Sequence, residues 1–133
     1  LDVAIKMAGK EAVKNVVMLA ITPNDPSNPP LLNDLSKRIT TKYGPDTTML
    51  GQSANSLWVL KQIIEAAQSF EPAAVKAKWE ATDKVETFFG PGKVCGDQTY
   101  GIKHHVVAHP EPFEILKDGK VVSAGYSGEI FIP

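Results

Sequence analysis

The sequence predicts an α/β fold, with helices mainly in residues 1–82 and short strands, including a hairpin, in residues 92–132. Two observations support this class. An apolar, β-branched run at residues 16–21 has the pattern of a strand buried on both faces, and amphipathic helical patterns follow it, as in layered α/β proteins. At 133 residues the chain can form one hydrophobic core, so a single domain is expected over residues 1–133.

The first elements are predicted to be a short helix and a strand. Apolar residues recur at helical spacing over residues 1–8, and Gly9 then ends the helix. The strand is "VVMLAI" at residues 16–21, and the Pro- and Asn-rich residues 22–30 form a loop after it. Asn28 and Pro29 suit the N-cap and first turn of a second helix. Its apolar residues repeat every four positions up to Gly44: Leu31, Leu35, Ile39 and Tyr43.

Two further helices are expected before residue 82. One begins near Gln52 or Ser53. Its apolar face is predicted to hold Leu57, Leu60, Ile64 and Ala67, widened by Trp58 and Val59. The other has Pro72 in its first turn, with Val75 and Trp79 four residues apart. Both tryptophans lie among aliphatic residues, which favours core packing over stacking on a ligand.

The last third of the chain changes character. Residues 85–101 are turn-rich, and β-prone runs follow at residues 102–109, 112–117, 120–126 and 129–132. Asp118-Gly119 between two of these runs is a strong signal for a two-residue hairpin loop.

Charge and cysteine content exclude several classes of function. With 14 basic and 15 acidic side chains the formal net charge is −1, so no nucleic acid partner is expected. The single cysteine, Cys95, excludes an internal disulfide. The longest nearly apolar run, residues 15–23, is too short to span a bilayer. The chain begins inside a helical pattern and without methionine, which suggests a fragment or a processed piece.

All three histidines lie within residues 104–109, and they raise the question of a metal site. In a helix His105 and His109 could share a metal, but Val106, Val107 and the following proline favour a strand. In a strand His104 and His105 point to opposite faces. A site assembled from Cys95, Asp97 and one histidine stays open, but the spacing does not require it. No metal and no cofactor are therefore predicted.

A thiol enzyme is the alternative function. It would use Cys95 as the nucleophile with His104 or His105 as the base. The glycine-rich residues 90–96 lack the spacing of a phosphate-binding loop. No credible pair of acid and base carboxylates is found, so no catalytic residue is predicted.

Four stretches follow one another in an order that carries a resemblance. They are "AGKEAVKNVVMLAITPNDPSNP", "LLNDLSKRITTKYGPD", "ANSLWVLKQIIEAAQSFEPAAVKAKWEATD" and "FFGPGKVCGDQTYGIKHHVVAHPEPFEILKDGKVV". This succession, over about residues 4–122, resembles the last third of the substrate-binding proteins of branched-chain amino acid ABC transporters, the type I periplasmic binding family.

The resemblance implies a periplasmic-binding-protein-like fold, of which this chain would be a partial three-layer α/β/α lobe and a C-terminal fragment. Members of the family have two lobes that hinge shut on a solute in the cleft between them. It further implies a periplasmic or extracytoplasmic binding protein rather than an enzyme. Such a protein takes an amino acid, an amide, urea or an aromatic carboxylate and docks on a membrane permease.

The family's ligand contacts in this region come from the loop that leads into the helix after "KYGPD". On this sequence, the resemblance places Met49 and Gln52 as ligand-binding residues. The family's Tyr-Asp-Ala pattern at the helix entrance is not recognisable in "QSANSLW". Most of the pocket comes from parts of the family's chain that are not in this sequence, so exposed apolar surface and a homodimer are expected.

Overall fold

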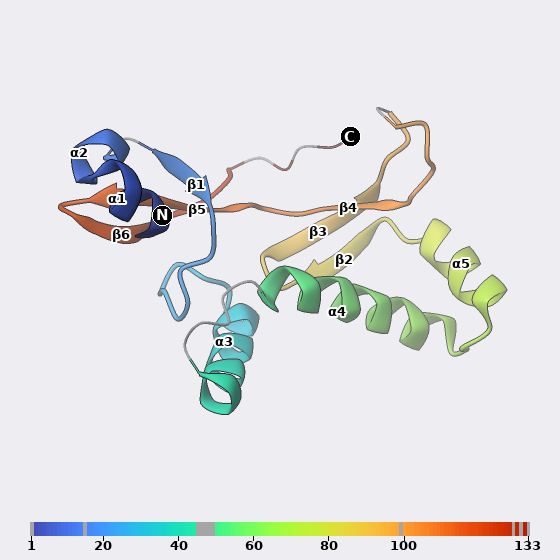
Figure 1. Ribbon diagram of the computed structural model, residues 1–133. Coiled ribbons are helices and arrows are strands. Elements are labelled where there is room, and N and C mark those ends of the chain that lie inside the picture. Colours follow the sequence, from blue (N-terminus) through green and yellow to red (C-terminus); the bar gives the residue numbers. More distant parts are fainter. Residues whose placement is uncertain are drawn as a thin grey trace. The chain divides into compact units, whose positions relative to one another are not determined.

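In the computed structural model the chain forms two compact units (Figure 1). Unit 1 comprises Leu1–Met49 and Glu111–Gly128, and unit 2 comprises Leu50–Pro110 and Glu129–Pro133. The structure describes residues 2–14, 16–44, 50–98, 100–128, 130 and 132, without the side chains of residues 2 and 50–52. This part holds five helices and two small antiparallel sheets, so the predicted mixture of α and β structure is confirmed.

Unit 1 holds three helices and one sheet. The helices are α1 (Asp2–Ala8), α2 (Lys10–Val13) and α3 (Pro30–Tyr43). The sheet has the order β1-β5-β6, formed by β1 (Val17–Leu19), β5 (Pro112–Lys117) and β6 (Lys120–Tyr126). The predicted hairpin is confirmed: Asp118 and Gly119 join β5 to β6 with φ values of 50° and 74°, as a type I′ turn requires. The end of α1 at Gly9 is also confirmed, with the Gly9 N–H bonded to the Ile5 carbonyl at 2.9 Å.

The buried side chain of Asn28 organises the loop before α3. Its Nδ2 donates to the Thr22 carbonyl at 2.9 Å and to Asn33 Oδ1 at 3.1 Å, while its Oδ1 accepts the Tyr126 hydroxyl at 2.8 Å. The prediction that Asn28 caps α3 is therefore wrong by one residue. Pro29 holds the N-cap position instead, and the amide of Asn28 is used to join three parts of unit 1.

Hydrogen bonds, burial and charge shift the pKa values of two groups near this amide, Asp25 and Tyr126. The side-chain hydroxyl and the backbone N–H of Ser27 both donate to Asp25 and lower the pKa of its carboxyl group. Burial raises the pKa of Tyr126 to about 12, and the negative charge of Asp25 adds to the effect. The hydroxyl that donates to Asn28 thus stays protonated through the neutral range.

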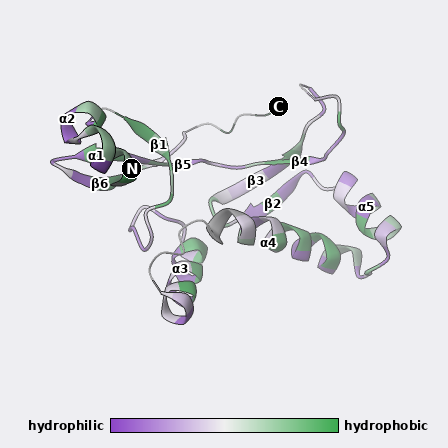
Figure 2. Cartoon of the chain, viewed as in Figure 1, coloured by the Kyte–Doolittle hydropathy of each residue, from purple (hydrophilic) through white to green (hydrophobic). Residues whose placement is uncertain are grey.

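Strand β1 is correctly predicted as a strand, but its expected burial on both faces is wrong. It pairs with β5 alone, antiparallel, and so forms one edge of the sheet. Val17 and Leu19 are 58% and 53% exposed, although Figure 2 shows β1 in hydrophobic colours. An apolar run specifies a strand, but the neighbours that would cover it are a tertiary property.

Unit 2 holds two helices and a second sheet. The helices are α4 (Leu50–Ala67) and α5 (Pro72–Glu80), and the sheet has the order β2-β3-β4. Its strands are β2 (Lys84–Thr87), β3 (Gly90–Cys95) and β4 (Val106–Ala108). The prediction of α5, with Pro72 in the first turn, is confirmed. The hairpin β2–β3 lies in residues that were expected to be turn-rich, and its strands were not predicted. Its loop consists of Phe88 and Phe89, which are not ordinary turn residues, so no signal for a hairpin is visible in the sequence here.

The buried face of α4 differs from the predicted one. Asn55, Val59 and Ile63, at intervals of four residues, are buried, whereas Leu57 is 70% exposed. Val59 and Ile63 pack on Val85 and Val94 of the sheet, with Val75, Trp79 and Val107 around them. Helix α4 is apolar on more than one side, so its periodicity alone does not select the face that meets the sheet.

Two side-chain amides of α4 bond to the β2–β3 hairpin. The Gln62 amide accepts from the Glu86 N–H at 2.9 Å and donates to the Glu86 carbonyl at 2.7 Å, so it satisfies backbone groups on the outer edge of β2. Asn55 Oδ1 accepts the Phe88 N–H at 2.9 Å in the hairpin loop. Together these bonds fix the register of α4 along β2.

The expected strand at residues 102–109 is shorter in the structure. Strand β4 covers only Val106–Ala108, and His104 has a positive φ of 51°. His104 and His105 therefore lie in a turn before the strand, and the prediction that they alternate across a sheet is wrong. The run at residues 129–132 includes Glu129 and Phe131, which lie outside the described residues. Among the helices described, none combines the length and the apolar character needed to cross a membrane.

Candidate functional site

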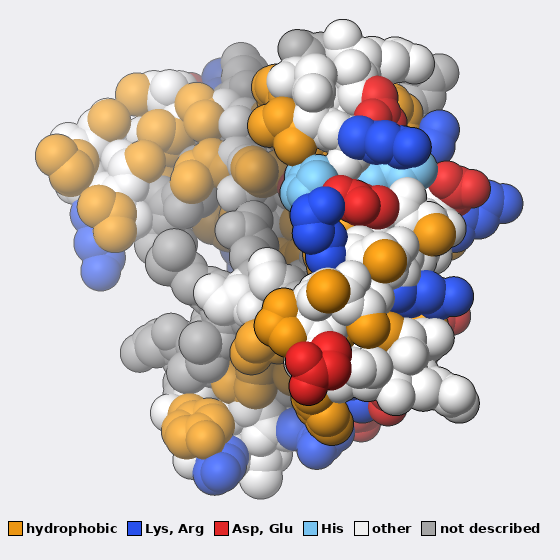
Figure 3. Space-filling view, turned by 90° about the vertical axis from the view of Figure 1, so that its right-hand side faces the viewer, with side chains coloured by type: hydrophobic (Ala, Val, Ile, Leu, Met, Phe, Trp, Pro, Cys, Tyr) orange, Lys and Arg blue, Asp and Glu red, His pale blue; other side chains and the backbone are white. Residues whose placement is uncertain are grey.

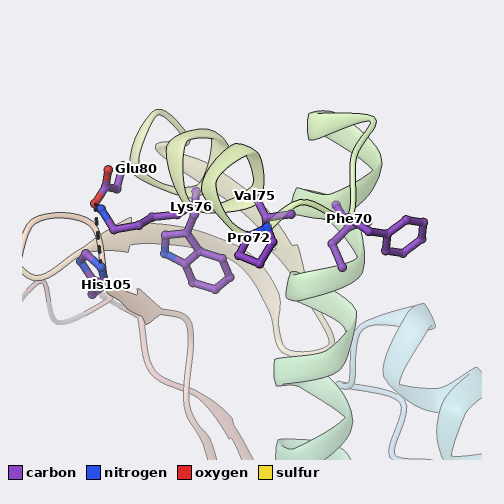
Figure 4. Close-up of a pocket in the computed structure, with 8 residues that line it drawn as sticks. Phe70, Pro72, Val75, Lys76, Glu80 and His105 are labelled. Carbon is purple, nitrogen blue, oxygen red and sulfur yellow. Dashed lines mark hydrogen bonds and ion pairs between the residues drawn. The ribbon is translucent and has the colours of Figure 1, made fainter.

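A hollow in unit 2, the α5 groove, lies along α5. Its volume is about 450 Å³. Its apolar wall consists of Ile64, Phe70, Pro72, Val75 and Trp79, and its polar wall consists of Lys76, Glu80 and His105. Figure 4 shows the polar residues at one end and Pro72, Val75 and Phe70 toward the other. The groove therefore has an amphipathic lining.

Helix α5 positions this lining through its periodicity. Val75 and Trp79 are four residues apart, and so are Lys76 and Glu80, so each pair forms its own stripe along the helix. Val75 and Trp79 also pack against the core of unit 2, which anchors the apolar stripe. Phe70, in the connection before α5, also lines the groove, but it is 87% exposed and its ring points away from Pro72 and Val75 (Figure 4).

Glu80 is the centre of the charges at the polar end. Lys76 Nζ lies 2.6 Å from Glu80 Oε1, and His105 Nε2 lies 4.0 Å from the same oxygen. The hydrogen bond from Lys76, with smaller contributions from the charges of Lys76, His105 and Lys103, lowers the pKa of the Glu80 carboxyl group. Three basic groups thus surround one carboxylate. Figure 3 shows histidine side chains among acidic and basic ones on this side of the molecule.

His104 links the turn before β4 to the end of α5. Its Nδ1 lies within hydrogen-bond distance of the Glu80 carbonyl, and because a carbonyl only accepts, this nitrogen carries the proton. Its Nε2 lies 3.7 Å from a carboxylate oxygen of Asp83 and 3.7 Å from one of Asp97. The positive φ of His104 turns the chain so that His105 follows at the α5 groove.

A close backbone approach holds the same turn in place. Gly96 has φ of 122°, and the Ile102 N–H bonds to the Gly96 carbonyl at 3.1 Å. A Cβ at Gly96 would lie 2.7 Å from the Ile102 carbonyl oxygen, so the position requires glycine. This closure brings Asp97 and His104 together, although no local motif in the sequence indicates the contact.

Cys95 is buried in β3 and pairs with Val106 of β4. Within the described part of the chain, no hydrogen bond joins its thiol to the imidazole of His104 or of His105. Both imidazoles instead face groups at the end of α5 and in the turn itself. The geometry does not assemble the nucleophile and base that the alternative function requires.

Metal ligands are not gathered either, as far as the described residues show. They contain no group of three or more His, Cys, Asp and Glu side chains placed to hold an ion. The sequence left open a metal site made of Cys95, Asp97 and one histidine. Asp97 and His104 do lie close together, but the third side chain beside them is Asp83 and not Cys95.

The resemblance places two ligand-binding residues, Met49 and Gln52, at the entrance of α4. Met49 lies outside the described residues, and so does the side chain of Gln52, whose backbone is in the first turn of α4. The tryptophans are described, and both pack as predicted: Trp58 lies 5.6 Å from Phe88 between ring centroids, and Trp79 contacts the core. Sequence reasoning missed that Trp79 also lines the α5 groove.

Other residues of the α5 groove were also missed. The i,i+4 spacing of Lys76 and Glu80 is visible in the sequence and indicates their ion pair. His105 joins them from a segment more than 20 residues away, which no local pattern reveals. Comparison of the chain with protein-family models and with curated proteins finds no match.

Proposed function

We propose that this chain is part of an extracytoplasmic solute-binding protein of an ABC transporter. In this role it helps to bind a small amino acid, amide or aromatic carboxylate and to deliver it to a membrane permease. The finer fold in this proposal is the partial three-layer α/β/α lobe of the periplasmic-binding-protein type that the resemblance implies.

One observation carries the proposal. The chain forms two compact units, and it passes from one to the other between residues 49 and 50 and back between residues 110 and 111. Repeated passage between two bodies is the organisation that the resemblance implies for receptors that hinge around a solute.

The exposed strand β1 is consistent with the same role. Strand β1 has the β-branched sequence that is typical of strands buried on both faces. In the structure it lies at the edge of a three-stranded sheet, with Val17 and Leu19 largely exposed. Further sheet or helix packed on it would complete a layered lobe, as the proposed fold requires.

The test is a binding screen with the whole chain, read by NMR. The panel contains leucine, isoleucine, valine, small amides, urea and benzoate, each titrated at constant protein concentration. A solute class that shifts amide signals of the chain, with saturation, is the expected result. If every solute of the panel leaves these signals unchanged up to 10 mM, the proposal fails for this chain.

A thermal measurement gives the affinity scale. A ligand present at 100 times its dissociation constant adds about 2.7 kcal/mol to the stability of the folded state. The midpoint of thermal unfolding then rises by several degrees, and the rise grows with the logarithm of the ligand concentration.

A further inference from the structure

We propose that the α5 groove is a separate binding site for a small amphipathic carboxylate, with an aromatic or branched apolar body and one anionic head. The site lies entirely within unit 2 and does not depend on the solute-binding role proposed above. Three features of the groove support such a ligand: its size, its division into an apolar and a polar end, and the balance of charges at the polar end.

The size and the apolar wall suit a small organic molecule. A volume of about 450 Å³ lies within the usual range of ligand pockets, roughly 300–1,000 Å³. The wall includes the Trp79 indole, which offers flat apolar surface to an aromatic ring, beside the aliphatic side chains of Val75 and Ile64. An apolar body placed against this wall leaves water, which favours binding.

The charges at the polar end select the sign of the head group. Lys76 Nζ lies 2.6 Å from the Glu80 carboxylate and His105 Nε2 lies 4.0 Å from it, so two basic side chains of the groove meet one acidic side chain at this point. Lys76 remains 65% exposed although it is paired, and it can donate further hydrogen bonds from its ammonium group. A carboxylate therefore meets more attraction than repulsion, and an ammonium group meets the reverse.

The first experiment compares three probes with the same body and different heads. They are 3-phenylpropionate, 3-phenylpropan-1-amine and 3-phenylpropan-1-ol, titrated against the whole chain and read by the two indole N–H signals in NMR. We expect 3-phenylpropionate to bind with a dissociation constant on the order of 1 mM. It should shift the Trp79 signal and leave the Trp58 signal in place. The amine should bind at least about fivefold more weakly than the carboxylate.

Two substitutions in the groove should act in opposite directions. Lys76→Gln should weaken binding of 3-phenylpropionate about fivefold, because it removes the principal cation. Glu80→Gln should strengthen it about threefold, because it removes the only carboxylate of the groove. Lys78→Gln is the matched control, since Lys78 lies on the same helix but does not line the groove, and it should leave the affinity unchanged within twofold.

The outcomes separate this proposal from its rivals. Equal binding of amine and carboxylate, the same change in both Lys76→Gln and Glu80→Gln, or no Trp79 shift at 10 mM probe would overturn it. A Trp79 signal that depends on protein concentration but not on the probe would overturn it in favour of self-association through the groove. The two proposals can fail independently. A panel solute that still binds the Lys76→Gln variant supports the solute-binding role, whether or not the groove site meets the criteria above.

Discussion

Removal of the Asn28 amide should strongly destabilise unit 1. The side chain is buried, with 7% of its surface exposed, and it makes hydrogen bonds to Thr22, Asn33 and Tyr126. Asn28→Ala takes away all three bonds and leaves the Thr22 carbonyl and the Tyr126 hydroxyl without this partner. Each bond contributes about 1 kcal/mol net, so the expected loss in the free energy of unfolding is about 3 kcal/mol.

A double-mutant cycle resolves one of these bonds. Tyr126→Phe removes only the hydroxyl that donates to Asn28 Oδ1 at 2.8 Å, and it should cost about 1 kcal/mol. The double variant should cost about 1 kcal/mol less than the sum of the two single variants, because the shared bond is counted once.

The assay is urea unfolding followed by the NMR amide signals of α3 and β6, which lie in unit 1. The Trp58 and Trp79 indole signals report on unit 2 in the same samples. The reasoning is refuted if Asn28→Ala lowers the free energy of unfolding by less than 1 kcal/mol. It is also refuted if the cycle shows no coupling between Asn28 and Tyr126.

Four further outcomes follow from the same structure. Stability supplied by Tyr126, whose pKa is raised to about 12, should be complete below pH 10 and lost as the pH rises from 10 to 12. The loss should be about 1–2 kcal/mol because the phenol is only partly buried, and pH-dependent unfolding of Tyr126→Phe should lack it. Gly92→Ala should destabilise unit 2 by about 2–3 kcal/mol in urea unfolding, because the new Cβ would lie 2.6 Å from Thr87 Cγ2 and 3.2 Å from the Ala108 carbonyl. Gly119→Ala should cost about 1 kcal/mol in thermal unfolding because φ of 74° strains an L-residue, whereas Gly119→Asn should cost less. Gln62→Ala should cost about 1 kcal/mol and speed hydrogen exchange of the Glu86 amide, an effect that Lys61→Ala should not share.

Several elements could be predicted because their signals are local. Gly9 ends α1, Pro72 begins α5, and Asp118-Gly119 closes a hairpin, since each of these residues restricts or permits backbone angles within its own turn. The overall mixture of helices first and strands last followed from the same kind of signal. Local steric preferences act in the sequence itself, and tertiary contacts did not override them here.

The faces of these elements could not be predicted in the same way. Helix α4 is apolar around much of its circumference, and only the position of the β2–β3 hairpin decides that Val59 and Ile63 are buried while Leu57 is exposed. Strand β1 has the composition of a covered strand, but its burial depends on which elements pack against it. Whether a face is buried depends on both elements that pack together, so the sequence of one element alone does not decide which of its faces is buried.

The candidate site shows the same division. The sequence by itself predicted that Val75 and Trp79 share a stripe of α5, and it contains the i,i+4 spacing of Lys76 and Glu80 that was missed. Only the tertiary structure brought His105 to that pair and closed the α5 groove, because the turn before β4 depends on the close backbone approach at Gly96. In a helix, side chains one turn apart are neighbours because of the helix geometry alone. A contact between distant segments forms only if the interactions of the folded chain offset the entropy cost of closing the loop between them.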